Sequence, residues 1–447
     1  MAQTNYRRTL VGQQSGVQVN MPVDRVDRML ADAGDQTFAV VGRFSRGRID
    51  KPFLVSAGKM RRMLGAPRSM RSGAANETYV QIFEAFENGA AAAVVSRVVS
   101  SQAVNRWVVV NHGDSNIVTS AAAVPQSSNT TWLAAFRFAD CINEGLYITV
   151  QKGDSDRELS ATFRERVKNS SGSDTADGEI LYSFTGSTDP EAKDDMGVGC
   201  FLPDVVARYY GDWVEAVVND AAAQILPADA LALCPCISAI TPFVDGGEAD
   251  AEAYKKAAER LGNTSVPFRY ILSESSNTSL VNALLGVGQK WNRIMMQEIS
   301  GSLSLEAAVS WKNRFRYDAQ GGMYCMWVWS PIKRDDPTYA SGNLLFGTVG
   351  QKIGRACARN AVSNGFGLPA LNQPIAGKDF MLSGTNVQQV YYPDDVELAA
   401  LAKAHINPVQ YVSYHDGSGY VWDDSLSGAK KNGILRLESA VEISVWN

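Results

Sequence analysis

The clearest hydrophobic pattern in the chain lies in residues 76–99, where a helical stripe is followed by a continuous apolar run. The stripe recurs at helical spacing and consists of Tyr79, Ile82, Phe83 and Phe86. Asn76 is placed to cap the start of this helix, and Gly89 follows its last turn, where glycine readily adopts a left-handed conformation. Residues 90–95 are apolar without alternation, which is typical of a strand covered on both faces. This stretch therefore predicts a helix followed by a buried strand.

A second pattern, with short alternating segments, begins near residue 107. Strands are expected at 107–110, 132–138, 145–150, 159–167 and 180–185. In one of them Leu146, Ile148 and Val150 share one face, while Tyr147 and Thr149 share the other. Clusters of Gly, Ser, Asn and Asp separate the segments, as in an antiparallel β-sandwich.

The region from residue 202 to residue 330 returns to alternating helices and strands. Helices are predicted at 205–225, 251–261, 280–291 and 305–311. Strands are predicted at 231–240, 268–272, 294–296 and 323–329, and earlier in the chain at 38–42 and 52–55. Further helices are expected at 23–30, 347–360 and 394–404. Repeated strand–helix units indicate a mainly parallel sheet with helices on both faces.

The two ends of the chain contain the strongest candidates for contacts with other molecules. Residues 1–22 are polar apart from one alternating segment, which contains Gly16, Val17, Val19 and Met21. A lone strand needs a partner, such as the sheet edge of another subunit, and the other interpretation is a disordered tail. Near the C-terminus one face of an alternating segment consists of Leu435, Leu437, Val441, Ile443 and Val445. We expect a half-buried antiparallel strand there, which closes its own core or lies against a neighbour.

Composition places the chain among globular proteins of several domains. It has 447 residues, of which 45% are hydrophobic and 20% are charged. No apolar run reaches the length of a membrane-spanning helix, and the first residues contain no apolar signal core. The net charge of −5 argues against a general nucleic-acid binder.

The charge is unevenly distributed along the chain. Residues 1–75 contain 13 Lys and Arg against 5 Asp and Glu, a balance of +8, which leaves −13 for the remainder. Opposite charge on the two parts would favour head-to-tail contacts between copies. The alternative is a solvated surface on which charges cluster by chance.

No pattern typical of an active site or metal centre is present. The pair Cys234 and Cys236 lacks a second pair at zinc spacing, so we expect no metal. Gly42 and Gly47 have the spacing of a phosphate-binding loop without its Lys and Ser or Thr, so we expect no nucleotide and no other cofactor. The chain has three histidines, which are His112, His405 and His415, and no Gly-x-Ser-x-Gly motif. His415 precedes a glycine-rich turn between strands, and Asp245 with the two glycines after it is interpreted as a loop.

Several of these segments resemble parts of the contractile-tail sheath proteins of bacteriophages. The resemblance rests on the helix ending in Phe86-Glu87-Asn88-Gly89 and the strand ending in Val95-Ser96-Arg97-Val98. Similar pieces are the opening strand with Gly16 and Val17, the core opening at 52–65, the strand entry at 140–150, the turn at 365–372 and the segment at 405–407. Two departures are Leu371, inserted in the turn, and His405, where the family usually has glycine. Many members also continue beyond a strand like 433–447 into a helix and an extended arm.

The resemblance implies an α/β multidomain fold with a subtilisin-like, mostly parallel core. An antiparallel β-sandwich would be inserted into this core, and extended arms would lie at the ends. The expected segments are an arm at 1–22, core at 23–103, the sandwich at 104–195, the subtilisin-like domain at 196–372 and a C-terminal core domain at 373–447 that ends in a strand.

The function implied by the resemblance is mechanical, and the chain is expected not to be an enzyme. It would polymerise helically around a tail tube in many copies and contract to drive the tube through the host envelope. Its partners would be itself, the tube protein, and baseplate and tail terminator proteins, with no direct nucleic-acid contact and no membrane insertion. It would be part of the virion and would be assembled in the host cytoplasm. The rivals are an α/β hydrolase-like enzyme with an inserted β-domain and another virion component, although tube proteins are usually small β-barrels.

Overall fold

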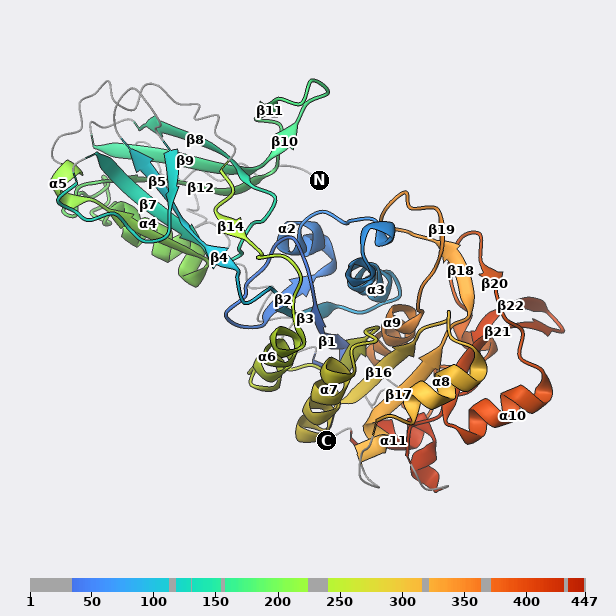
Figure 1. Ribbon diagram of the computed structural model, residues 1–447. Helices are drawn as coiled ribbons and strands as arrows, with labels where there is room; N and C mark the ends of the chain where they lie inside the picture. The colour runs from blue at the N-terminus through green and yellow to red at the C-terminus, as the bar shows by residue number, and fades with distance from the viewer. Residues whose placement is uncertain are drawn as a thin grey trace, which may run out of the picture. The chain divides into compact units, whose positions relative to one another are not determined.

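The chain folds as two compact units, and one is inserted into the sequence of the other (Figure 1). The computed structural model describes residues 34–111, 118–129, 131–153, 157–223, 240–315, 321–362, 371–429 and 433–445. The inserted unit comprises residues 102–245, and the host unit comprises residues 30–101 and 246–447. The expected α/β architecture of several domains is thus confirmed.

The host unit is built on one sheet of eight strands. In spatial order these are β2 (Phe53–Ser56), β3 (Ala92–Arg97), β1 (Thr37–Gly42), β15 (Tyr270–Ser273), β16 (Ile294–Ile299), β17 (Cys325–Trp329), β21 (Ile406–Tyr414) and β22 (Gly417–Trp422). The six inner strands pair in parallel, and the two edge strands β2 and β22 pair antiparallel. The inner strands β1, β3, β15, β16 and β17 are fully buried, as their continuous apolar runs predict.

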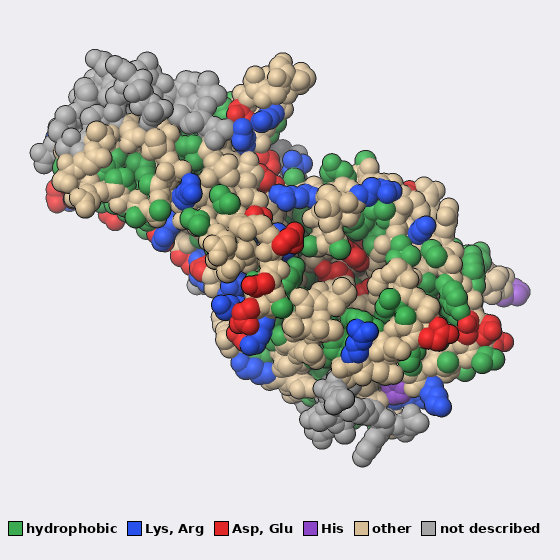
Figure 2. All heavy atoms as spheres, viewed as in Figure 1, with side chains coloured by type: hydrophobic (Ala, Val, Ile, Leu, Met, Phe, Trp, Pro, Cys, Tyr) green, Lys and Arg blue, Asp and Glu red, His purple; other side chains and the backbone are tan. Residues whose placement is uncertain are grey.

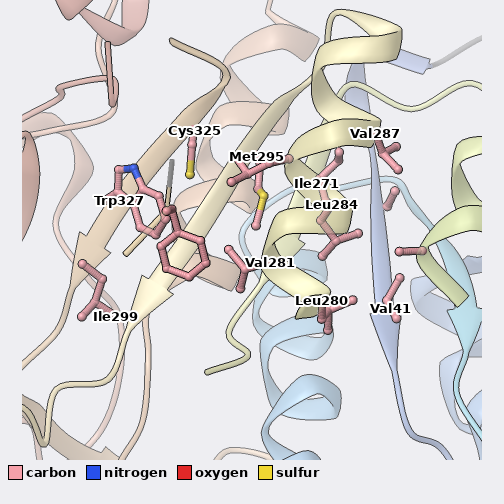
Figure 3. Close-up of a cluster of buried hydrophobic side chains, with 14 of the residues drawn as sticks. Val41, Ile271, Leu280, Val281, Leu284, Val287, Met295, Ile299, Cys325 and Trp327 are labelled. Atoms are coloured by element: carbon pink, nitrogen blue, oxygen red, sulfur yellow. The ribbon is translucent and has the colours of Figure 1, made fainter. Parts of the chain in front are cut away.

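Helices cover both faces of this sheet. They are α2 (Met60–Leu64), α3 (Glu77–Glu87), α6 (Ala251–Gly262), α7 (Thr278–Trp291), α8 (Leu305–Lys312), α9 (Val349–Ala361), α10 (Asp395–Lys403) and α11 (Glu438–Ser444). One face packs against α6, α7 and α8, and Figure 3 shows labelled side chains of α7 and of the strands directed toward one another. On the other face the Phe38 ring lies 5.9 Å from the Phe86 ring of α3, and α9 packs beside α3. A small antiparallel sheet of β19 (Asn343–Leu345), β18 (Ile332–Asp335) and β20 (Gln388–Gln389) completes the unit.

Glycines allow α3 and α9 to approach closely. A Cβ added at Gly354 would lie 2.5 Å from the carbonyl oxygen of Ala85, and one added at Gly89 would lie 2.6 Å from the Cβ of Ala358. Gly350 meets the backbone of α3 in the same way. Gly350, Gly354 and Ala358 are four residues apart, so they form a smooth stripe on the α9 surface. The main chain of one helix therefore packs directly against the other helix.

The inserted unit consists mainly of two antiparallel sheets around one hydrophobic core. The first sheet has the order β13 (Val214–Val218), β7 (Trp132–Phe138), β5 (Trp107–Asn111) and β6 (Val118–Ala121). The second has the order β12 (Ile180–Ser187), β9 (Glu158–Glu165) and β8 (Leu146–Lys152). Rings from both sheets pack in the shared core, with Phe136 5.4 Å from Phe163 and 5.1 Å from Phe184.

The remaining elements of this unit are short. They are α4 (Leu202–Tyr210), α5 (Asp220–Ala223) and the two-stranded ribbons β4 (Val104–Asn105) with β14 (Phe243–Val244) and β10 (Val167–Lys168) with β11 (Asp174–Thr175). The unit runs to Asp245, beyond the boundary expected at residue 195, because α4 and β13 contribute to its core.

Three local expectations were wrong. The helix predicted over 205–225 ends at Tyr210, since Gly211 adopts a positive φ of 57° and Val214–Val218 then pairs with β7 as strand β13. Asn76 does not cap α3 through its side chain, which instead donates a hydrogen bond to the Ser69 carbonyl oxygen. The C-terminal strand expected over 435–445 is instead a 3₁₀ turn followed by helix α11.

Some expectations fall outside the described residues. These are the arm at 1–22, the helix at 23–30, nearly all of the strand at 231–240 and most of the turn at 365–372, together with His112, Cys234 and Cys236. Among the helices that the structure describes, none has the length and apolar character needed to cross a membrane.

Candidate functional site

The residues proposed for pairing between subunits fall into two groups. Gly16, Val17, Val19 and Met21 lie outside the described residues. The C-terminal group is described and is divided between core and surface. Val441 and Val445 are buried in the chain's own core, whereas Leu435, Leu437 and Ile443 are exposed beside the exposed Ile434.

Helix α11 is held by charged groups that are fully buried. Glu438 lies 3.1 Å from the Lys352 Nζ, and Glu442 lies 2.5 Å from a guanidinium nitrogen of Arg359. The Tyr270 hydroxyl also donates to Glu442, at 3.0 Å. Burial raises the pKa of the Glu442 carboxyl to about 7, although the Arg359 charge acts in the opposite direction.

Hydrogen bonds to backbone groups also hold this segment against the rest of the host unit. Arg269 donates to the carbonyl oxygens of Glu442 and Val445, at 2.9 and 2.7 Å, and so binds the end of α11. The Glu438 N–H donates to the Ser425 carbonyl oxygen at 3.1 Å. Helix α11 is therefore docked on the host unit. Its polar contacts fix its position, and Val441 is the apolar side chain that it buries.

Sequence reasoning missed this docking. The signal that was available is the spacing of Glu438 and Glu442, four residues apart, which places both carboxylates on one face of a helix. Their partners Lys352 and Arg359 are seven residues apart on α9, which is two helical turns. No local sequence pattern indicates that the two glutamates of α11 pair with the two basic residues of α9.

A second polar cluster lies at the carboxyl ends of the parallel strands, where open α/β sheets bind ligands. It contains Glu77, Glu274 and Glu298, and Figure 2 shows acidic side chains in a hollow near α3. Burial, reinforced by the Glu274 charge, raises the pKa of Glu77 to about 8, and burial raises that of Glu298 to about 7.

Two of these carboxylates, Glu77 and Glu298, bind main-chain amide groups at the start of α9. Glu298 accepts hydrogen bonds from the N–H groups of Thr348 and Val349, at 2.8 and 3.1 Å, and Glu77 accepts one from Gly347 at 2.8 Å. They satisfy amide groups that would otherwise lack partners at the helix N-terminus. In the part of the chain that the structure describes, no group of three or more His, Cys, Asp or Glu residues is arranged to hold a metal ion.

The two described histidines and two of the four described cysteines, Cys325 and Cys357, are in structural surroundings. His405 is buried at a positive φ of 56°, and its Nδ1 lies 2.9 Å from the Ser427 carbonyl oxygen. His415 is exposed in the turn between β21 and β22, as predicted. Burial raises the pKa of the Cys325 and Cys357 thiols, which keeps them protonated. These four residues provide no pair of nucleophile and base.

The chain is similar to several solved structures. No family model matches the chain, and no curated protein matches it. Among solved structures the chain is similar to the sheath tail protein from Desulfitobacterium hafniense, with 13% sequence identity and a TM-score of 0.48. The alignment covers 96% of this chain and 80% of that protein.

Proposed function

We propose that this chain is the structural subunit of a contractile tail sheath. The observation that carries the proposal is the order of the sheath-like segments along the sequence. The block at 76–99 forms α3 and the buried strand β3 of the host sheet, and an antiparallel two-sheet unit follows directly after it. A mainly parallel core of the kind related to subtilisin, with such an insertion, is the arrangement that the resemblance implies.

In this proposal many copies assemble helically around a tail tube. The tube protein, a baseplate and a tail terminator are the other partners, and the assembly is part of a virion built in the host cytoplasm. Nucleic acid is not contacted directly, and no segment enters a membrane. Contraction rearranges the contacts between copies and drives the tube through the envelope of the target cell.

Strand addition by the N-terminal arm would keep copies connected while other contacts change. The alternating segment with Gly16, Val17, Val19 and Met21 has the pattern needed to add to the sheet of a neighbour. The host unit offers two edge strands, β2 and β22, for such an addition. Each backbone hydrogen bond contributes about 0.5–1.5 kcal/mol, so several per copy would hold a lattice together.

The C-terminal residues have a different role in this proposal from the strand expected at first. Leu435, Leu437, Val441, Ile443 and Val445 belong to a turn and a docked helix, so they contribute no strand in this conformation. The hydrolase alternative would require a nucleophile near the acidic cluster. Two of the three carboxylates there, Glu77 and Glu298, bind the amide groups at the start of α9, and Glu274 accepts a hydrogen bond from the Thr78 hydroxyl.

Negative-stain electron microscopy of the purified protein at high concentration tests the proposal. We expect hollow, striated rods, because a sheath subunit assembles with itself. Monomers or small closed oligomers at every concentration would contradict a sheath and reopen the enzyme interpretation.

A further inference from the structure

One edge of the eight-stranded sheet carries a strongly basic segment. From residue 51 to residue 76 the chain contains six basic side chains and no acidic one: Lys51, Lys59, Arg61, Arg62, Arg68 and Arg71. This segment includes the edge strand β2, helix α2 and the turn after it. Arg61, Arg62, Arg68 and Arg71 are exposed, and Figure 2 shows Lys and Arg side chains gathered near α2.

The opposite edge of the same sheet carries the opposite charge. From residue 391 to residue 424 the chain contains one Lys and six acidic side chains: Asp394, Asp395, Glu397, Asp416, Asp423 and Asp424. This segment includes α10, β21 and the edge strand β22. Figure 2 shows acidic and hydrophobic side chains together near α10.

Large apolar side chains lie among these acidic groups. Tyr392 is 69% exposed and Val396 is 78% exposed, and Val390 and Tyr411 are about half exposed. Aromatic side chains inside a charged rim are typical of the anchor residues of protein interfaces. We call this set of four residues and the six carboxylates the acidic face, and we call the six basic residues the basic face.

The two faces lie at the two ends of one rigid sheet. Eight strands separated by about 4.8 Å place the edge strands roughly 34 Å apart. The two faces therefore cannot neutralise each other within one copy. A contact that joins one face to a different face on the next copy is heterologous, and repeated contacts of this kind form rings or open helical filaments.

We infer that the acidic face binds the basic face of a second copy of this chain. The charges steer and align the two copies, and Tyr392 and Val396 supply the apolar burial that retains the contact. The inference rests on the self-assembly proposed above and adds which surfaces meet.

Two variants of the full chain, each altered on one face, test the inference. The first is Arg62→Glu/Arg68→Glu on the basic face, and the second is Tyr392→Ala/Asp395→Lys on the acidic face. Asp394 is left intact because it caps α10. Association is measured by sedimentation velocity over a range of protein concentrations, and circular dichroism checks that each variant is folded.

We expect each variant alone to associate at least 10-fold more weakly than the unaltered chain. An equimolar mixture should form a one-to-one dimer at concentrations where neither variant associates alone, because one intact face of each kind remains. The matched control is Glu252→Lys/Glu259→Lys on α6, whose side chains are about half exposed, and it should associate like the unaltered chain.

Association of either variant as strong as that of the unaltered chain would overturn the inference, and so would a mixture without a dimer. If both variants form rods, the proposed contact between the two faces is wrong, whereas the proposed sheath function is unaffected. If the mixture forms a dimer but the unaltered chain forms closed rings, the contact between the two faces is supported and the sheath function is contradicted.

Discussion

At the scale of single residues, the contact between α3 and α9 depends on positions where the residue has no side chain or a very small one. Where glycine and alanine line a helix, the backbone of the partner helix fills the space that a larger side chain would occupy. Substitution there forces the two helices apart, because a carbonyl oxygen on the main chain cannot rotate away as a side chain can.

Gly354→Ala should destabilise the host unit by about 1–3 kcal/mol. The new Cβ would lie 2.5 Å from the Ala85 carbonyl oxygen. Gly286→Ala in α7 is the matched control, since nothing lies within 4 Å of its added Cβ. It should stabilise by about 0.5–1 kcal/mol, because alanine favours a helix. Urea unfolding measures both, and a Gly354→Ala variant as stable as the control would disprove the close contact.

Glu298→Gln should change how stability depends on pH. The folded chain holds the Glu298 proton up to a pH of about 7, whereas the unfolded chain releases it near its usual value of 4.5. The folded state thus binds more protons in this range, and the contribution of Glu298 to stability falls as the pH rises. Glutamine does not titrate and still offers an oxygen to the Thr348 N–H. The variant should therefore gain roughly 2 kcal/mol relative to the original chain between pH 5 and pH 8. Urea unfolding at pH 5 and at pH 8 measures the difference in unfolding free energy between the variant and the original chain. The same difference at both pH values would contradict this prediction.

At the scale of elements, α11 shows how one sequence pattern fits two structures. Leu437, Val441 and Val445 are four residues apart, so they share a face in a strand and also nearly share one in a helix. In the helix, Glu438 and Glu442 pair with the buried positive charges of Lys352 and Arg359 on α9, which is distant in sequence.

Lys352→Met should release α11. The change leaves the Glu438 carboxylate buried without its cation, which costs about 3–5 kcal/mol. Trypsin cleavage after Arg436 should become faster, and adding Glu438→Gln to the same chain should restore much of the resistance. Lys378→Met is the control, because its ion pair with Asp416 is exposed and contributes less than about 1 kcal/mol. Unchanged cleavage in Lys352→Met would show that the ion pair does not hold the helix.

Sequence patterns predicted those helices and strands whose buried faces are visible in the order of apolar and polar residues within one segment. Helix α3, the apolar run of β3 and the alternating strands β8 and β9 were all found this way and are confirmed. Of the stripe expected on α3, Ile82 and Phe86 are buried, whereas Tyr79 and Phe83 are only partly buried. The helix expected over 205–225 was wrong, because periodicity did not reveal that Val214–Val218 has a strand partner in β7. The polar cluster at the start of α9 joins Glu77, Glu298 and Gly347, which are far apart in sequence, so no local pattern indicated it.

At the scale of the whole molecule, the proposed arm is expected to be dispensable for folding. Residues 1–22 are polar apart from one alternating segment, so we expect a chain without them to keep its fold. We expect that this chain forms no rods, as judged by electron microscopy, with circular dichroism like that of the full chain. Val17→Pro/Val19→Pro should have the same effect, because proline cannot donate the backbone hydrogen bonds of a strand. Gln13→Pro, outside the alternating segment, is the control, and normal rods from the double proline variant would rule out the arm.

The two ends of the inserted unit leave it side by side. Val104 pairs with Val244, and Asn105 pairs with Phe243, so β4 and β14 form a short antiparallel stem. The host chain therefore enters and leaves the inserted unit at adjacent points. The distance between these points does not depend on the size of the inserted unit. Evolution can enlarge, shrink or replace such a module without disturbing the order of the strands in the host. The same stem offers a protein engineer a place to graft a foreign domain with adjacent termini.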